Sequence, residues 1–461
     1  MSFELQFFGA TGQVTGSLYA LRSNGHLVLM ECGLVQGGQR EEEQNRQDFP
    51  VAIDEIDAVV LSHAHIDHSG RVPLLVQRGY RGPVYTQNAS KALCEIMLPD
   101  AGYLNEKDAE WQNKKLRAKG KRPIAPLYTR ADAVECLEQF RSAAYDEPFD
   151  VVPGLEVRFH DAGHILGAAI VELTQKNPGG AKTLVFSGDL GYRDAPVMNS
   201  PVAISHADAV LMESTYGDRL HRSFDATIEE LTGVFSAARA GKGNILIPAF
   251  TVGRTQDLLY LMAEHYDEWQ LDDWQIFLDS PMGIEATRVY SDYRHLYGAR
   301  LFGPDSSLPD LPNYHASRTT EDSMAINKIE SGAIIIAGSG MCSGGRILHH
   351  LKNNIWRPEC HIVIVGFQAY GTLGRRIVDG AKEIRLWGDT YSVRAQVHTV
   401  GGLSAHADQL DLVNWYNNFD NKPPLYLVHG EPEPQRILKQ LLENDHGANV
   451  TIAEHGQSVD V

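Results

Sequence analysis

The most constraining feature of the sequence is a run of metal-binding residue types that directly follows a short apolar segment. His63, His65, Asp67 and His68 lie within six positions, immediately after Ala58–Leu61. Burying three imidazoles and a carboxylate together is costly unless a positive charge neutralises them. Neutral imidazoles with a carboxylate suit a divalent cation, zinc above all. Because His63 and His65 can point one way while Asp67 and His68 point another, the run predicts two adjacent ions.

Composition and charge narrow the class of protein. The 461 residues are 43% apolar and 22% charged, which is typical of a globular protein with two or three domains. A net charge of −18 excludes a protein that coats duplex nucleic acid by bulk charge, although a phosphate-binding groove needs only local positive potential. The nearest basic run lies between Lys114 and Arg122, and we interpret it as a solvated helix face.

The cellular compartment is suggested by the cysteines and the N-terminus. Five scattered cysteines without CxxC spacing favour reduced thiols inside a cell. The N-terminus has no signal-peptide pattern, and no apolar stretch reaches the roughly 18 residues of a membrane span. We therefore expect a cytoplasmic protein with no membrane association.

The pattern of apolar residues divides the chain into regions. Strand-like segments with short turns dominate the first third, with Thr129 as a predicted helix N-cap, and alternating strands and helices begin near residue 206. Repeated strand–loop–helix units predict a parallel sheet with helices on its faces. One unit passes from a predicted strand into a helix at Ser280-Pro281. We expect an α/β protein in which one domain is inserted into another, with boundaries at 1–205, 206–395 and 396–461.

Three short motifs together resemble the metallo-β-lactamase fold. The run from His63 to His68 matches the HxHxDH signature of that fold, Asp161–His164 resembles its third motif, and Phe186–Asp189 resembles its fourth. The order and spacing of the set carry the resemblance, because Gly-His and Gly-Asp pairs are each common in turns. The resemblance implies an αββα sandwich in which His164 completes the first metal site and Asp189 bridges two ions.

One position departs from the pattern of that fold family. Glu31 precedes Cys32-Gly33, where relatives usually carry Asp. In the family this acid is thought to accept a hydrogen bond from a ligating histidine. Glu31 can do the same with one more methylene, so we expect a change in fine geometry and continued metal binding.

Three further motifs resemble the β-CASP subgroup of this fold. They surround Glu213, His406 and His429, and further likeness extends the resemblance from residue 5 to about residue 435. The β-CASP family comprises nucleic-acid-processing nucleases, including the endonuclease subunit of the pre-mRNA 3′-cleavage complex and related bacterial and archaeal ribonucleases. The resemblance implies that the segment after residue 205 is an inserted β-CASP domain, a parallel sheet flanked by helices.

The same resemblance assigns the metal ligands. It implies two Zn²⁺ per chain, with Mn²⁺ as a substitute: one ion on His63, His65, His164 and Asp189, the other on Asp67, His68, Asp189 and His429. His406 is then free of metal, and Glu213 could orient it as a proton donor. Taken without the family match, Glu213 is more simply a strand-end acid that caps a turn. We interpret His398, which follows a similar strand, as structural.

Two glycine-rich turns are candidates for holding phosphate groups. Gly338–Arg346 and Gly371–Arg376 each follow a β-rich run and open a helix, so backbone N–H groups could face an anion. Neither ends in Gly-Lys-Ser/Thr, so ATP binding is not expected. Taken alone, each loop is equally well explained as a tight turn that needs glycine. The candidate phosphate-binding residues are Arg254, Ser339, Gly340, Ser343, Thr372, Arg375 and Arg376.

These features predict a two-zinc ribonuclease. A hydroxide activated by both metals would attack the phosphodiester, with Asp67 as a proton acceptor and His406 protonating the departing 3′-oxygen. We expect single-stranded RNA as substrate, because a site in a cleft between domains is too narrow for a duplex. The alternatives are a non-catalytic RNA-binding β-CASP subunit and a hydrolase of small phosphodiesters or thioesters. Endonuclease or exonuclease mode, RNA or DNA preference and a homodimeric state are left open.

Overall fold

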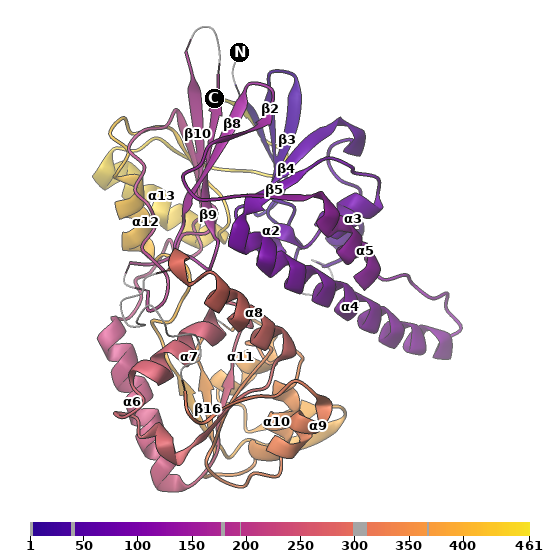
Figure 1. The fold of residues 1–461 in the computed structure, drawn as a ribbon, viewed down its shortest axis with the longest axis vertical. Coiled ribbons are helices and arrows are strands. Elements are labelled where there is room, and N and C mark those ends of the chain that lie inside the picture. Colours follow the sequence, from indigo (N-terminus) through magenta and orange to yellow (C-terminus); the bar gives the residue numbers. More distant parts are fainter. Residues whose placement is uncertain (1–2, 38–41, 177–179, 194, 298–310, 367) are drawn as a thin grey trace. The chain divides into compact units, whose positions relative to one another are not determined.

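The fold comprises two compact units of the chain. The computed structural model describes residues 3–37, 42–176, 180–193, 195–297, 311–366 and 368–461 (Figure 1). Unit 1 consists of Met1–Arg193, Asn199–Leu220 and His406–Val461, and unit 2 of Asp194–Met198 and His221–Ala405. The three domain boundaries expected from the sequence, at 1–205, 206–395 and 396–461, therefore differ from the limits of these units.

Unit 1 contains two seven-stranded sheets that face each other. The first has the order β22-β1-β2-β3-β4-β5-β6 and the second the order β21-β20-β11-β10-β9-β8-β7. The strands of the first sheet are β22 (Ser458–Asp460), β1 (Glu4–Phe7), β2 (Tyr19–Ser23), β3 (His26–Met30), β4 (Ile56–Val60), β5 (Val84–Gln87) and β6 (Phe140–Ala143). Those of the second are β21 (Val450–Ile452), β20 (Leu425–Leu427), β11 (Ala209–Met212), β10 (Lys182–Phe186), β9 (Ala169–Gln175), β8 (Leu155–Asp161) and β7 (Phe149–Val152).

The core of unit 1 lies between these sheets. Alternate residues of each strand point inward, and they form one buried cluster that includes Phe7 and Tyr19 of the first sheet and Phe159 and Phe186 of the second. The rings of Tyr19 and Phe186 meet edge to face, with centroids 5.5 Å apart. Each such fully buried side chain stabilises the fold by about 1.5–3 kcal/mol.

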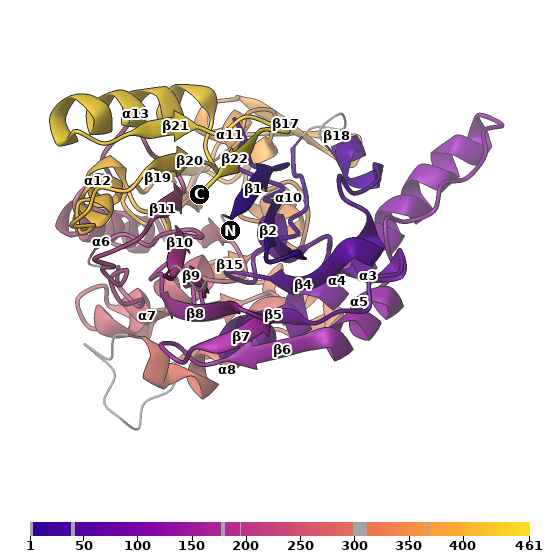
Figure 2. The same cartoon turned by 90° about the horizontal axis from the view of Figure 1, so that it is seen from above.

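Helices cover the outer faces of both sheets. Figure 2 shows α12 and α13 on one side of the paired sheets and α3, α4 and α5 on the other. The helices of unit 1 are α2 (Ile66–Ser69), α3 (Val72–Gln77), α4 (Asn88–Ala118), α5 (Arg130–Cys136), α12 (Gln409–Tyr416) and α13 (Pro432–His446). This four-layer arrangement is the αββα sandwich predicted from the sequence.

Unit 2 is built on a parallel sheet, as predicted. Its strand order is β14-β13-β15-β12-β16-β19, and every neighbouring pair runs parallel. The strands are β12 (Ile245–Pro248), β13 (Gln275–Leu278), β14 (Tyr314–Ala316), β15 (Ala333–Ala337), β16 (His361–Ile364) and β19 (Gln396–Thr399), with a separate hairpin of β17 (Glu383–Leu386) and β18 (Asp389–Ser392). The pairing of β19 with β16 extends this unit beyond residue 395.

Both faces of this sheet are buried, which explains its continuous apolar strands. Leu246 and Ile362 belong to a cluster formed with α10 and α11, while Ile334 and Ile336 point to the opposite face and are also fully buried. The helices are α6 (Phe224–Gly241), α7 (Arg254–Glu264), α8 (Pro281–Asp292), α9 (Thr320–Ile326), α10 (Ile347–Asn354) and α11 (Leu373–Val378).

Two predicted helix caps are confirmed, whereas one long helix was not predicted. Thr129 caps α5 through a capping box with Asp132, and Ser280 caps α8 with Pro281 at the first helical position, both as predicted. The expectation that strands dominate the first third is wrong for α4, a helix of 31 residues. Its second half buries almost nothing, so the apolar periodicity that marks a packed helix is absent there.

None of the helices in the described part of the chain is both long enough and apolar enough to cross a membrane.

Candidate metal centre

The strand directions in unit 1 place the predicted metal ligands at one end of each sheet. In the first sheet β3 and β4 run parallel, so the segments that follow them, with Glu31 and His63, lie side by side. In the second sheet β9 is antiparallel to both neighbours, so β8, β10, β11 and β20 all point the same way. Their carboxyl ends lead to His164, Asp189, Glu213 and His429 respectively.

One group of four side chains surrounds a single point. The ligand atoms of His63, His65, His164 and Asp189 all lie within 4.8 Å of one another. His65 Nδ1 is 3.0 Å from His63 Nε2 and 3.2 Å from His164 Nε2. Asp189 Oδ2 is 3.5 Å from His63 Nε2 and 3.6 Å from His164 Nε2. Three imidazoles and a carboxylate that converge in this way form the donor set of a tetrahedral zinc site.

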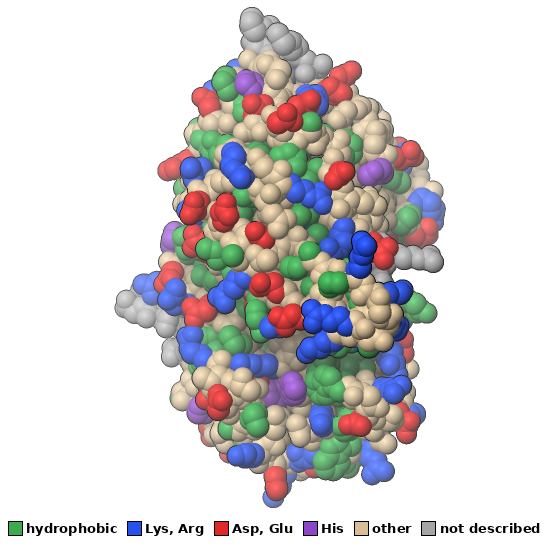
Figure 3. Space-filling model, turned by 90° about the vertical axis from the view of Figure 1, so that its right-hand side faces the viewer, with side chains coloured by type: hydrophobic (Ala, Val, Ile, Leu, Met, Phe, Trp, Pro, Cys, Tyr) green, Lys and Arg blue, Asp and Glu red, His purple; other side chains and the backbone are tan. Residues whose placement is uncertain are grey.

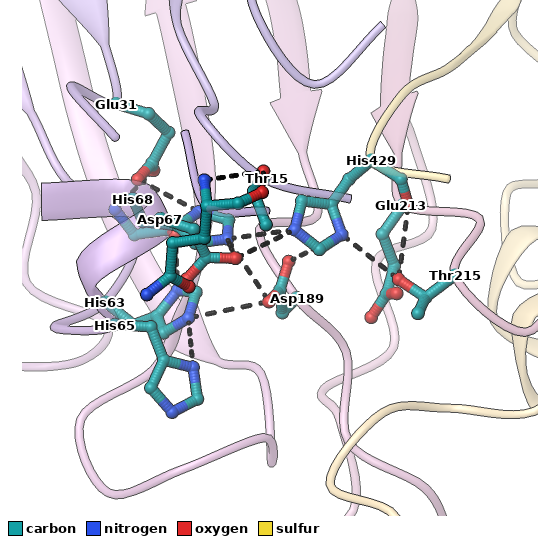
Figure 4. Close-up of polar contacts among 12 residues, drawn as sticks. Thr15, Glu31, His63, His65, Asp67, His68, Asp189, Glu213, Thr215 and His429 are labelled. Atoms are coloured by element: carbon teal, nitrogen blue, oxygen red, sulfur yellow. Dashed lines mark hydrogen bonds and ion pairs between the residues drawn. The ribbon is translucent and has the colours of Figure 1, made fainter. Parts of the chain in front are cut away.

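A second group lies next to the first and shares Asp189 with it (Figure 4). The ligand atoms of Asp67, His68 and His429 again lie within 4.8 Å of one another. Asp189 Oδ2 is 3.2 Å from His68 Nε2, and Asp189 Oδ1 is 3.6 Å from His429 Nδ1. The structure thus brings together all seven residues proposed as ligands, with Asp189 between the two groups.

The charge states of these side chains favour the binding of a cation. Burial lowers the pKa of His63 well below its ordinary value and that of His65 to about 4, so these imidazoles are neutral. Burial alone would raise the pKa of Asp189, but the surrounding imidazoles hold it well below its ordinary value. Among the described residues no donor is within hydrogen-bonding geometry of Asp189 Oδ1, although this oxygen is buried. The pKa of His68 is instead held well above its ordinary value, because Asp189 and Asp67 outweigh the effect of its burial. Neutral His63 and His65 and ionised carboxylates with an unsatisfied oxygen fit divalent cations, and a bound cation would displace the proton of His68.

Backbone hydrogen bonds fix the short helix α2 that carries Asp67 and His68. Ser17 N donates to Asp67 O at 2.9 Å, and Cys32 N donates to His68 O at 2.8 Å. Gly33 is required here, since a Cβ added to it would lie 1.6 Å from Asp67 O. The loop containing Ser17 and the turn after β3 therefore position two ligands that are distant from them in sequence.

Polar side chains outside the ligand set hold three of the histidines. Glu31 Oε2 lies 3.2 Å from His68 Nδ1, while Glu31 Oε1 accepts a 2.7 Å hydrogen bond from Ser62 N. Ser62 Oγ lies 2.9 Å from His63 Nδ1. Thr215 Oγ1 lies 3.0 Å from His429 Nδ1. Sequence reasoning identifies Glu31 and misses Ser62 and Thr215, whose only signal is that each adjoins a motif residue.

Two residues of the cluster have strained backbones. Glu31 has φ of 65° and His429 has φ of 47°, the left-handed region that side chains other than glycine rarely adopt. His429 is held there by its N–H, which donates to Ala10 O at 2.7 Å. Strain of this kind persists where the surrounding structure fixes the conformation, which is common at functional sites.

His406 and Glu213 form a pair beside the two groups. Glu213 is fully buried, and both of its carboxylate oxygens lie within 3.2 Å of His406 Nδ1. Burial disfavours the charged form of His406, but Glu213, Asp189 and Asp67 outweigh this and raise its pKa to about 9. Leu190, next to Asp189 in sequence, links the segments that carry Asp189, Glu213 and His406. Its N–H donates to Glu213, and its carbonyl accepts from Ala407 N.

Glu213 itself lies close enough to be a ligand. Its carboxylate and the side chains of Asp189 and His429 offer atoms within 4.8 Å of one another. However, Leu190 N donates to Glu213 Oε1 at 2.6 Å, and the His406 ring approaches both oxygens. These contacts use the oxygens of Glu213, so we assign it to positioning His406.

The candidate phosphate-binding residues lie in unit 2, in the loops that follow β12, β15 and β16 and in the first turns of α7 and α11. These loops touch: Gln368 Nε2 donates to Gly340 O at 2.9 Å, and a Cβ on Gly340 would lie 2.9 Å from Phe250. Ser339 Oγ accepts from Ser343 N and Gly344 N, and Thr372 Oγ1 caps α11 by accepting from Arg375 N. These two hydroxyls thus stabilise the local backbone by accepting hydrogen bonds from it.

The three arginines among these candidates differ in exposure. Arg254 is buried and pairs with Asp257 at 2.9 Å. Arg375 is exposed and pairs with Asp379 at 2.9 Å, and Arg376 is exposed. Arg375 and Arg376 are therefore the side chains of this set that are accessible to an anion.

Family comparisons agree with the two-part fold. A model of the metallo-beta-lactamase superfamily matches residues 11–129, and a Beta-Casp domain model matches residues 255–377. A third, described as a Zn-dependent metallo-hydrolase RNA specificity domain, matches residues 390–453.

Known proteins resemble the whole chain. Ribonuclease TTHA0252 of Thermus thermophilus is 38% identical, over 98% of this chain and 99% of its own length. Transcription termination factor FttA of Methanococcus maripaludis is 30% identical over 92% of this chain, which spans 66% of FttA. A crystal structure of a protein of unknown function from Enterococcus faecalis covers the full length of both chains with a TM-score of 0.55 and 13% identity, which shows a shared fold only.

Metal analysis tests the ligand set directly. After incubation with zinc and dialysis into buffer without zinc, we expect the wild-type protein to retain about two ions per chain. Asp189→Ala should lose both, because the carboxylate of Asp189 faces both groups. His65→Ala should lose about one ion, since His65 belongs to the first group alone. The measurement is inductively coupled plasma mass spectrometry. His398→Ala, which removes a histidine from unit 2, is the control and should bind zinc as wild type does; full zinc retention by Asp189→Ala contradicts the assignment.

The packing of Gly33 against α2 gives a second test. Gly33→Ala should lower the melting temperature of the zinc-loaded protein and its zinc affinity, because the new methyl group displaces the backbone of Asp67; overpacking of this kind costs about 1–3 kcal/mol. Gly233→Ala is the matched control, since a Cβ there meets nothing within 4 Å. Calorimetry and zinc titration measure both variants, and equal behaviour of the two would show that Gly33 does not position α2.

Proposed function

The chain belongs to the β-CASP family of metallo-β-lactamase-fold ribonucleases and is a metal-dependent hydrolase, and from this we propose that it hydrolyses the phosphodiester bonds of single-stranded RNA at two zinc ions. The observation that carries the proposal is the convergence of seven candidate ligands, Asp189 among them, with the His406–Glu213 pair beside them. RNA as substrate is supported by the ribonuclease name of a relative that matches nearly end to end.

The proposed division of ligands follows the two groups. His63, His65 and His164 would hold one cation, Asp67, His68 and His429 the other, and Asp189 would contact both. Mn²⁺ is an alternative metal for the same donors. Bound cations would supply an activated water nucleophile and neutralise negative charge on the phosphate.

His406 is proposed as the group that protonates the departing 3′-oxygen. Both carboxylate oxygens of Glu213 lie at Nδ1 of His406, and the His406 side chain is 22% exposed whereas Glu213 is fully buried. The His406 ring also packs 4.5 Å from that of His164, which keeps it beside the metal ligands. A carboxylate-held imidazole that is partly exposed is suited to proton transfer.

Asp67 is proposed as the proton acceptor for the attacking water. Burial alone would raise its pKa, but His68 and His429 lower it to about 2, so the carboxylate is ionised at neutral pH. Its side chain is 19% exposed, which leaves an edge of the carboxylate accessible. An ionised, partly accessible carboxylate can accept a proton while it contributes to metal binding.

Two other functions are less well supported. A non-catalytic RNA-binding subunit needs neither metal ligands nor a proton donor, yet all seven ligand positions converge. A hydrolase of small diesters or thioesters does not need the large inserted unit 2. We propose a cytoplasmic setting, and the endonuclease or exonuclease mode is addressed by the experiment below.

Cleavage assays with labelled oligomers test the proposed function. Wild-type protein with zinc should cleave single-stranded RNA labelled at the 5′ or 3′ end, and DNA of the same sequence more slowly. A ladder of products would identify an endonuclease, and a terminal nucleotide an exonuclease. His65→Ala should lose activity; equal cleavage by wild type and His65→Ala would reject the chemistry.

The role of His406 has its own test. His406→Gln should lower kcat for RNA by about 10²–10⁴, the range for loss of a general acid. Glu213→Gln should have a smaller effect, because His406 remains but is less well oriented. An RNA with sulfur in place of the departing 3′-oxygen needs no proton donor, so on it His406→Gln should approach wild-type rate. The zinc content of each variant, which should be unchanged, is the control; an equal loss on both substrates would contradict the role.

A further inference from the structure

The second half of α4 extends beyond the body of unit 1. Nearly all the buried residues of this helix lie between Ala89 and Gly102, and Ala109 is the last of them. Figures 1 and 2 both show the C-terminal part of α4 projecting away from the sheets. This part needs an explanation, since a protruding helix gains little stability from tertiary packing.

Aromatic and cationic side chains alternate along this helix. Tyr103, Lys107, Trp111, Lys115 and Lys119 follow one another at intervals of four residues, which places each beside the next in a row that winds around the helix. Tyr103 is 45% exposed and Trp111 is 58% exposed. Lys115 Nζ lies 3.2 Å from the centroid of the Trp111 ring, and Lys107 Nζ lies 5.5 Å from that of Tyr103. Solubility alone does not explain two exposed aromatic rings on a solvated helix face.

The end of α4 and the loop after it are strongly basic. Between Trp111 and Arg130 the chain contains no acidic residue. It contains Lys114, Lys115, Arg117, Lys119, Lys121 and Arg122, all exposed, in a protein of net charge −18. Figure 3 shows the side of the molecule toward which α4 projects, where many Lys and Arg side chains are visible. The positive potential that the chain lacks overall is thus concentrated here.

Hydrogen bonds fix the loop against the helix. Asn113 Nδ2 donates to Ile124 O at 2.9 Å, and Ile124 N donates to Asn113 Oδ1 at 2.7 Å. Lys121 and Arg122 are therefore kept near the helix end. Three acids, Glu106, Asp108 and Glu110, lie between Tyr103 and Trp111, and Glu110 pairs with Lys107 at 3.0 Å. The basic surface consequently begins at Trp111, and we call residues 103–124 the α4 arm.

The other end of α4 lies next to the metal centre. Ser90 Oγ donates to Gly167 O at 2.7 Å, three residues after His164. The helix also packs against α2, which carries Asp67 and His68. At 1.5 Å per residue, Trp111 lies about 35 Å along the helix from Asn88. The α4 arm thus starts at the catalytic edge of unit 1 and leads outward from it.

We propose that the α4 arm binds the part of a single-stranded RNA that extends beyond the metal centre. This inference rests on the proposed ribonuclease function. Exposed Tyr103 and Trp111 offer surfaces on which bases stack, and the lysines and arginines between and beyond them contact phosphates. A protein partner is less suited to this surface, because its exposed large apolar side chains are only Tyr103, Leu104 and Trp111 and a dense cluster of positive charge follows them.

Binding measurements test the arm. The probe is fluorescein-labelled oligouridine. Every protein is loaded with zinc and carries His406→Gln, so that the RNA stays intact, and the His406→Gln protein without further changes is the parent. The K114Q/K115Q/K119Q variant should bind an RNA of about 20 nucleotides at least tenfold more weakly, and the slope of log Kd against log salt should fall by about 0.7 for each phosphate that the variant no longer neutralises. Trp111→Ala should weaken binding about fivefold or more. At about 3.4 Å per nucleotide of a stacked strand, an RNA of about 6 nucleotides spans about 20 Å, so when it is held at the metal centre it does not reach Trp111 and should show no such difference.

Matched controls separate local from general effects of charge. K176Q/R436Q/K439Q removes two exposed cations and one half-buried cation elsewhere in unit 1 and should bind like the parent protein. K114R/K115R/K119R keeps the charge and should retain affinity. Wild-type affinity and salt slope in both K114Q/K115Q/K119Q and Trp111→Ala would overturn the inference. If the same RNA is still cleaved by wild type, only the arm is rejected; if wild type neither binds nor cleaves RNA, the proposed function fails.

Discussion

The structure of the site depends on one buried carboxylate. Asp189 lies between two groups of imidazoles: its Oδ2 approaches His63 and His164 of the first group and His68 of the second, and its Oδ1 approaches His429 of the second. A buried carboxylate is costly unless it is paired, and neutral imidazoles alone do not compensate for it. Two divalent cations would satisfy both oxygens at once. The position of Asp189 at the end of a central strand, β10, makes this arrangement rigid.

Much of the surrounding structure holds ligands in place. The backbone of α2 is fixed from the loop at Ser17 and the turn at Gly33, where there is no room for a side chain. Left-handed backbone conformations at Glu31 and His429 place a carboxylate and an imidazole where a regular strand end would not. Such strain is tolerated because β3 and β20 are buried strands with many interactions.

The sequence predicts the fold class and the parallel sheet of unit 2, because both depend on local apolar patterns. Within the site, His63 to His68 are conspicuous because they are adjacent in the chain. His164, Asp189 and His429 are far apart in sequence, and only the family resemblance could select them among 19 histidines and many acids. Ser62 and Thr215 escape prediction, because their role is set by neighbouring side chains in space. The charge pattern of the α4 arm suggests only a solvated helix face, since exposure and ring contacts are not visible in such a pattern.

Anomalous scattering tests directly the proposal that two cations share Asp189. Crystals of zinc-loaded wild-type protein, measured above and below the zinc absorption edge, should show two anomalous peaks roughly 3.5–4 Å apart, with Asp189 contacting both. One peak would lie among His63, His65 and His164, and the other among Asp67, His68 and His429. A single peak, or none at these side chains in fully loaded crystals, would contradict the account.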